Sequence, residues 1–108
     1  MVTSTRLSKM KYNIPKQFNI GGQEIKVRTM KHIGIEGAIG VYKSLSNEIL
    51  VQTHMNGKPM AVSQVEQTYH HELIHCLFDH ARQEDLCCNE ELVDLMGELL
   101  YQVNKSSK

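Results

Sequence analysis

A chain of 108 residues, with 41% hydrophobic and 22% charged residues, is long enough for one compact domain and too apolar to be disordered throughout. Its 12 basic and 12 acidic residues give zero formal net charge, which excludes the generic electrostatic attraction to nucleic acid or anionic lipid that a basic protein has. No apolar run approaches the roughly 18 residues of a membrane span. We therefore expect neither a nucleic-acid partner nor a membrane partner.

The N-terminal part of the chain lacks the continuous apolar stretch of a secretory signal. We expect residues 1–15 to be a flexible lead-in and residues 16–108 to form a single domain. The cysteines are odd in number and two are adjacent, which makes a poor disulfide framework: Cys76, Cys87 and Cys88. These features predict a cytoplasmic protein in a reducing compartment.

Between about residues 17 and 54 the apolar residues recur with a period near two, which indicates β-strands. Two alternating runs meet at Gly21 and Gly22, which tolerate the positive φ angles of a tight hairpin turn. A second pair of strands is predicted over 38–43 and 48–54, joined by a polar turn. These strands are expected to form a small antiparallel sheet.

From Ser63 onward the apolar residues recur at helical spacing. Ser63 and Glu66 fit a capping box, in which the serine and glutamate side chains satisfy free N–H groups at a helix start. We expect one helix from about 64 to 81 and a second from about 86 to 103, with a short polar break between them. Strands followed by two packed helices give an α+β fold, with the helices on one face of the sheet.

The first predicted helix contains the sequence H-E-L-I-H at residues 71–75. Histidines at i and i+4 share one face of a helix, so His71 and His75 can bind the same cation. Glu72 points differently from both histidines and can reach a water bound to that cation. The pattern predicts a Zn²⁺ site with Glu72 as general base. His70 lacks the spacing of the pair and is expected to be exposed.

A catalytic zinc site needs a third protein ligand and an open fourth position. The second predicted helix begins N-E-E-L-V-D, where Glu90 and Asp94 share a face at i and i+4. Glu90 can supply the third ligand, and Asp94 can accept a hydrogen bond from the distal N–H of a ligand histidine. Glu91 and a cysteine, Cys87 or Cys88, are alternatives for the third ligand. Acidic residues also favour a helix N-terminus without any metal.

These two segments together resemble the two-helix active-site core of the gluzincins, whose thermolysin-like members follow an H-E-x-x-H helix with an N-E-x-x-x-D helix. The resemblance covers about residues 63–103. It extends to the compact minigluzincins and to phage- and prophage-associated metallopeptidase-like proteins of the ImmA/IrrE type. It implies that His71, His75 and Glu90 are the zinc ligands and that Glu72 is the general base. It also implies that Asp94 is the carboxylate that supports a ligand histidine. The implied function is zinc-dependent hydrolysis of a peptide or protein substrate.

In the large enzymes a second lobe stabilises the tetrahedral intermediate, and we expect no equivalent of it here, because few residues of this sequence follow the second predicted helix. The alternative function is a catalytically weak or inactive zinc-binding interaction module of phage or prophage origin. In the family that the chain resembles, an edge strand beside the zinc pairs with an extended substrate. We assign that role to Ile49, Leu50 and Val51, with a plain buried strand as the alternative.

Overall fold

The computed structural model describes residues 12–107, so most of the expected lead-in lies outside the described residues. The last residues of the expected lead-in contact the domain. Tyr12 and Ile14 pack against the core, and the backbone N–H of Asn13 donates to Glu66 Oε2 at 2.7 Å. Residues 12–14 therefore contact the domain that we expected to begin at residue 16.

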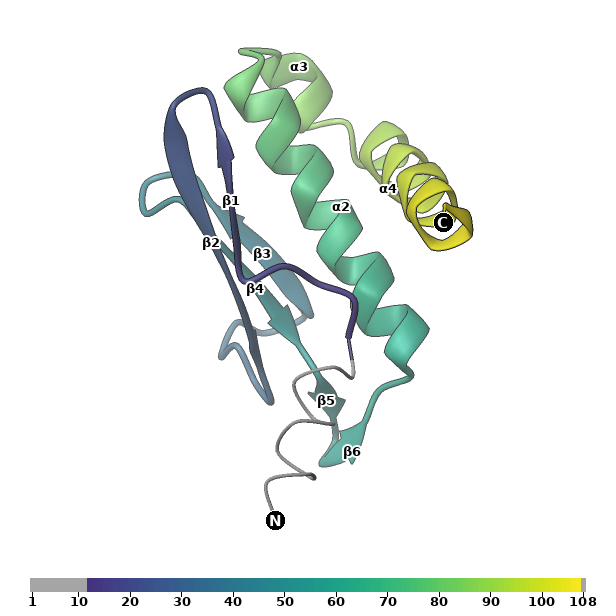
Figure 1. Cartoon of the computed structure of the whole chain (residues 1–108). Helices are drawn as coiled ribbons and strands as arrows, with labels where there is room; N and C mark the ends of the chain where they lie inside the picture. Colours follow the sequence, from purple (N-terminus) through teal and green to yellow (C-terminus); the bar gives the residue numbers. More distant parts are fainter. Residues whose placement is uncertain (1–11, 108) are drawn as a thin grey trace.

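A four-stranded sheet of order β1-β2-β4-β3 forms one layer of the molecule (Figure 1). The first predicted hairpin is present, with β1 (Gln17–Ile20) antiparallel to β2 (Gln23–Met30) and a turn at Gly21-Gly22, where φ is 57° and 78°. The second hairpin pairs β3 (Gly40–Lys43) with β4 (Glu48–Gln52). A separate two-stranded ribbon follows, made of β5 (His54–Met55) and β6 (Lys58–Pro59).

The sheet is mixed, because β2 and β4 run parallel, and the expectation of a wholly antiparallel sheet is wrong. The second hairpin joins the first through β4 and not through β3. The strand β4 is apolar along its middle, and a strand buried on both faces is favoured at an interior position of a sheet. Ile49, Leu50 and Val51 are all buried there. They therefore cannot form a substrate-binding edge, and our assignment of that role to them is wrong.

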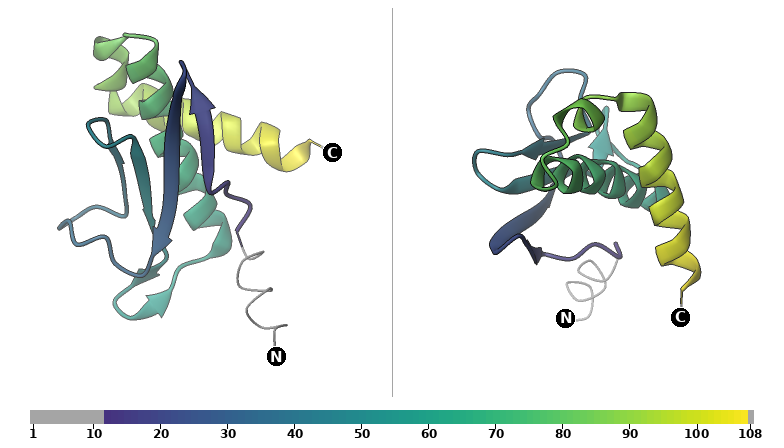
Figure 2. Two further views of the ribbon diagram at one scale, coloured as in Figure 1. Left: turned by 60° about the vertical axis from the view of Figure 1, so that its left-hand side comes forward. Right: turned by 90° about the horizontal axis from the view of Figure 1, so that it is seen from above.

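Helix α2 (Val62–His80) lies between the sheet and helix α4 (Glu90–Ser106), as Figures 1 and 2 show. The short helix α3 (Glu84–Cys87) connects them. The predicted second helix is thus split, because the side chain of Asn89 accepts a hydrogen bond from Leu92 N at 3.1 Å and starts a new helix. The predicted capping box is absent, since α2 begins at Val62 with Glu66 turned inward.

The core lies between the sheet and α2. It takes Ile25 and Val27 from β2, Ile49 and Val51 from β4, and Val65, Tyr69 and Cys76 from α2. The α2 residues recur at intervals of four and seven, which places them on the face of the helix toward the sheet. Within residues 12–107, none of the helices has both the length and the apolar character required to cross a bilayer.

Candidate metal centre

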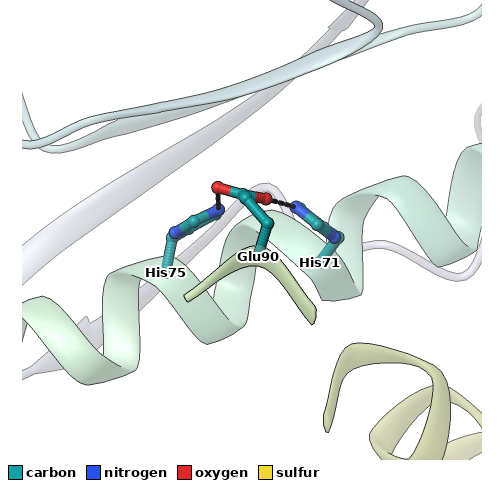
Figure 3. A group of neighbouring side chains, drawn as sticks. All are labelled: His71, His75 and Glu90. Atoms are coloured by element: carbon teal, nitrogen blue, oxygen red, sulfur yellow. Dashed lines mark hydrogen bonds and ion pairs between the residues drawn. The ribbon is translucent and has the colours of Figure 1, made fainter. Parts of the chain in front are cut away.

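The three predicted ligands meet at one point beside α2 (Figure 3). His71 and His75 lie one turn apart on α2, and the turn through α3 brings Glu90, the first residue of α4, opposite both rings. Glu90 Oε1 is 3.2 Å from His71 Nε2, and Glu90 Oε2 is 3.3 Å from His75 Nε2. One ligand atom from each residue lies within 4.8 Å of the other two.

The two nitrogen–oxygen distances join different oxygens of Glu90 to the two rings, and the contact of Glu90 with His71 is also a hydrogen bond. Both distances are of the size expected between neighbouring ligand atoms of one metal ion. Ligand atoms bound to zinc at about 2.0–2.1 Å along tetrahedral directions stand about 3.3 Å apart. Two imidazole nitrogens and a carboxylate are also a usual donor set for catalytic zinc. The residues present therefore fit this ion.

Asp94 lies on the far side of the His71 ring from Glu90. Its Oδ1 is 3.4 Å from His71 Nδ1, whereas the Nε2 of the same ring faces Glu90. This is the position that a carboxylate needs in order to select the Nδ1–H tautomer and leave Nε2 free to bind a metal. Asp94 thus lies close to the His71 ring, and its role in orienting that ring stays a prediction.

The cysteine alternative finds no support in the arrangement of the described residues. Cys87 Sγ is 3.6 Å from His75 Nδ1, the ring nitrogen opposite the one that faces Glu90, and also lies 3.5 Å from the backbone oxygen of His75. Desolvation raises the pKa of the Cys87 thiol. Cys88 is exposed, and neither cysteine nor Glu91 belongs to the group of converging ligand atoms.

Glu72 is buried between α2 and β3, next to the three converging side chains. Burial raises the pKa of its carboxyl group, while His71 and His75 and a hydrogen bond from the Tyr42 backbone lower it. A carboxylate with a raised pKa accepts and releases a proton more readily near neutral pH. This environment suits a general base.

A cavity of about 770 Å³ opens over these residues. Its floor is α2, its walls are β3 with the preceding loop on one side and the start of α4 on the other, and Asp79 and Cys87 lie at one end. The charged residues that line it are acidic, apart from the two histidines: Glu72, Asp79, Glu90 and Asp94. A space of this size is sufficient for several residues of a ligand.

The wall formed by β3 is a free sheet edge in the described part of the chain. Gln52 N donates to Ile39 O, so Ile39 and Gln52 form a hydrogen-bonded pair. Hydrogen-bonded and non-hydrogen-bonded pairs alternate along antiparallel strands, so the next pair, Gly40 with Val51, and the pair of Tyr42 with Ile49 are not hydrogen-bonded. The backbone groups of Gly40 and Tyr42 therefore point away from β4, toward the cavity. The hydrogen bond from the Tyr42 backbone to Glu72 agrees with this. The edge that we expected at β4 is provided by β3.

Two features of the site were not predicted from the sequence. Asp79 follows His75 at i+4 and accepts a hydrogen bond from Tyr42 Oη at 2.7 Å, which ties β3 to α2 beside the cavity. Its spacing from His75 was the signal that could have revealed it. His70, expected to be exposed, is buried: its Nδ1 is 2.8 Å from Glu66 O and its Nε2 is 2.9 Å from Asn104 Nδ2.

No family model matches this chain. No curated protein and no solved structure matches it either.

Proposed function

We propose that this protein is a zinc-dependent metallopeptidase of the gluzincin type. The observation that carries the proposal is the convergence of His71, His75 and Glu90, each of which has one ligand atom within 4.8 Å of those of the other two. The buried carboxylate of Glu72 lies beside them in the same cavity. The three free cysteines are compatible with the reducing cytoplasm that we assign to it.

In this proposal His71, His75 and Glu90 hold the ion, and Asp94 fixes the orientation of the His71 ring. A zinc ion held there would supply Lewis acidity and lower the pKa of a water molecule. Glu72 would accept a proton from the attacking water at its buried carboxylate and would donate it to the nitrogen of the leaving amine. Burial of Glu72, which raises the pKa of its carboxyl group, favours both transfers.

The substrate is an extended peptide that pairs with the free edge of β3. Gly40 offers both its N–H and its C=O toward the cavity, and Tyr42 offers its C=O. Main-chain pairing of this kind holds a peptide in register without regard to its side chains. It would lay the scissile bond along the cavity, between β3 and the three metal-binding residues.

The test is hydrolysis of a mixed library of quenched fluorescent peptides by the zinc-loaded protein. We expect Glu72→Gln to retain zinc and to lose hydrolysis by about 100-fold or more. Glu91→Gln is the matched control, because it removes a neighbouring carboxylate outside the converging group and should hydrolyse peptides as the wild type does. Equal hydrolysis by Glu72→Gln and wild type would contradict the mechanism.

A second candidate is a zinc-binding interaction module without peptidase activity. The observation that favours it is that no lysine or arginine of the described chain lines the cavity, so a cationic group to stabilise an oxyanion is not evident. Full zinc occupancy without cleavage of any library peptide would select this function.

A further inference from the structure

The end of the cavity beyond His75 carries a carboxylate that the proposed chemistry does not use. Asp79 follows His75 by about one turn of α2, is partly buried, and lines this end of the cavity with Tyr42 and Cys87. Asp79 does not belong to the group of converging ligand atoms, and the proposed base is Glu72. The Asp79 carboxylate is therefore available to contact another part of a bound peptide.

The Asp79 side chain is fixed at the cavity wall by a neutral partner. Tyr42 Oη on β3 donates to Asp79 Oδ2 at 2.7 Å, a bond that uses one of the two carboxylate oxygens. Within residues 12–107 the only carboxylate that forms an ion pair with a lysine or arginine is Glu48, through Arg28. A partly desolvated carboxylate without a cationic partner is stabilised when a ligand brings one.

The whole cavity has an excess of negative charge. Four carboxylates line it, and none of its described lining residues is a lysine or arginine. The two positive charges of a zinc ion would offset only half of these negative charges. A cleft lined by one sign of charge attracts and concentrates ligands of the opposite sign. The cavity thus favours a cationic peptide over an acidic one.

The edge of β3, which runs beside α2 (Figure 1), determines which residue of a bound peptide reaches Asp79. Residues directly opposite each other on neighbouring strands point to the same face of the sheet. A Cβ at Gly40 would face Glu72, so a peptide residue opposite Gly40 faces the metal centre. The Tyr42 side chain reaches Asp79, so the peptide residue opposite Tyr42, two positions along, faces Asp79.

We propose that the substrate carries a lysine or arginine two residues from the residue that lies opposite Gly40, and that Asp79 binds its side chain. This inference rests on the proposed peptidase function and names the class of peptide that the site takes. Charge-assisted hydrogen bonds between a carboxylate and an ammonium or guanidinium group are stronger than neutral ones. An acidic residue at the same position would bring like charges together, which opposes binding.

The probes are quenched fluorescent peptides that share one alanine-based host sequence. They carry lysine, norleucine or glutamate at each position in turn, and norleucine reproduces the apolar stem of lysine without the charge. For the zinc-loaded chain we expect one position at which kcat/KM is about tenfold higher with lysine than with norleucine, and lower still with glutamate.

Two substitutions assign this preference to Asp79. Asp79→Asn should reduce the preference for lysine over norleucine to about twofold or less, because the amide oxygen still accepts the hydrogen bond from Tyr42 but carries no charge. Asp79→Lys should make the glutamate peptide the preferred one. The matched control is Asp85→Asn, which removes an exposed carboxylate of α3 outside the cavity and should keep the lysine preference. Circular dichroism verifies that each variant is folded.

Binding separates this inference from the peptidase function. The same host peptides with a single fluorophore are titrated with zinc-loaded Glu72→Gln, and the lysine peptide should bind about tenfold more tightly than the glutamate peptide. Absence of cleavage by the wild type would refute the peptidase function, and this titration would still decide the inference. Equal binding of the two peptides, or no binding of either, overturns it. Cleavage with an unchanged lysine preference in Asp79→Asn also overturns it and leaves the peptidase function intact.

Discussion

Gly97 of α4 lies directly against the backbone of His71 on α2. A Cβ atom at position 97 would stand 3.0 Å from His71 Cα and 3.1 Å from His71 N, closer than side chains normally approach backbone. This contact sets the separation of the two helices at the level of the metal centre. Because α4 carries Glu90 and Asp94, the same contact sets how far these carboxylates stand from the two histidines.

Gly97→Ala should therefore weaken zinc binding and destabilise the protein. Helix propensity alone predicts the opposite, since alanine in a helix interior is favoured over glycine by about 1 kcal/mol. The clash with backbone atoms cannot be relieved by a side-chain rotation, so we expect a net loss of about 1–3 kcal/mol in the free energy of unfolding. Zinc affinity, measured by chelator competition, should fall by about tenfold because α4 moves outward.

The control for this variant is Gln102→Ala, on an exposed position of the same helix. It should change the free energy of unfolding by no more than about 0.5 kcal/mol. A Gly97→Ala protein with wild-type stability and wild-type zinc affinity would show that the contact with His71 is unimportant.

Gly40→Ala tests the packing of β3 against α2. A Cβ there would lie 2.5 Å from Thr68 Cγ2 and 3.1 Å from Glu72 Cγ. We expect a loss of about 1–3 kcal/mol in thermal or chemical unfolding. Adding Thr68→Ala removes the nearest clashing atom, so it should restore part of this stability although Thr68→Ala alone does not stabilise. Purely additive effects in the double-mutant cycle would count against this packing.

Asp94→Asn tests the support of His71. The amide can no longer favour the Nδ1–H tautomer as a carboxylate does, so zinc affinity should fall by about tenfold or more. Glu91→Gln removes the same charge from the first turn of α4 and should leave zinc affinity nearly unchanged. Equal losses in both variants would assign the effect to the net charge of the helix and not to the contact of Asp94 with His71.

Ionisation of the Cys76 thiol should lower the stability of the protein in alkaline solution. Burial is the main cause that raises the pKa of this thiol from 9.0 to about 11. Because the folded protein disfavours the thiolate, this contribution to stability is complete below pH 9 and is lost as the pH rises toward 11. The free energy of unfolding should fall with a slope of up to about 1.4 kcal/mol per pH unit in this interval.

The comparison is made in reducing buffer between pH 9 and 10, because burial raises the pKa of Tyr69 from 10.0 to about 12 and its contribution to stability is lost mainly between these two values. Cys76→Ala should lower stability at neutral pH yet show a flatter alkaline decline. The exposed Cys88 offers a control, and Cys88→Ala should keep the wild-type slope. An unchanged slope in Cys76→Ala would refute this assignment.

The parts of the structure that were predictable from sequence are those set by local spacing. The hairpin at Gly21-Gly22, the two long helices and the closeness of Glu90 to the histidines of α2 all follow from periodicity or from i, i+4 geometry. The resemblance to the gluzincins added the pairing of the two helical segments. These features depend on few long-range contacts.

The errors arose where distant segments decide the outcome. The pattern of β4 shows that it is buried but not which strands flank it, so the parallel pairing with β2 and the edge position of β3 were missed. Glu66 fits a capping box locally, yet it is turned inward because Tyr101 Oη donates to it at 3.1 Å from α4. His70 was misplaced for the same reason, since its partner Asn104 is far along the chain.

X-ray absorption at the zinc edge of the purified, zinc-loaded chain tests the central claim most directly. We predict a single zinc ion per chain with nitrogen and oxygen neighbours only, two of them imidazoles, and loss of this signal in His75→Ala and Glu90→Ala. Sulfur in the first coordination sphere, or an unchanged spectrum in His75→Ala, would contradict the assignment of His71, His75 and Glu90 as the metal ligands.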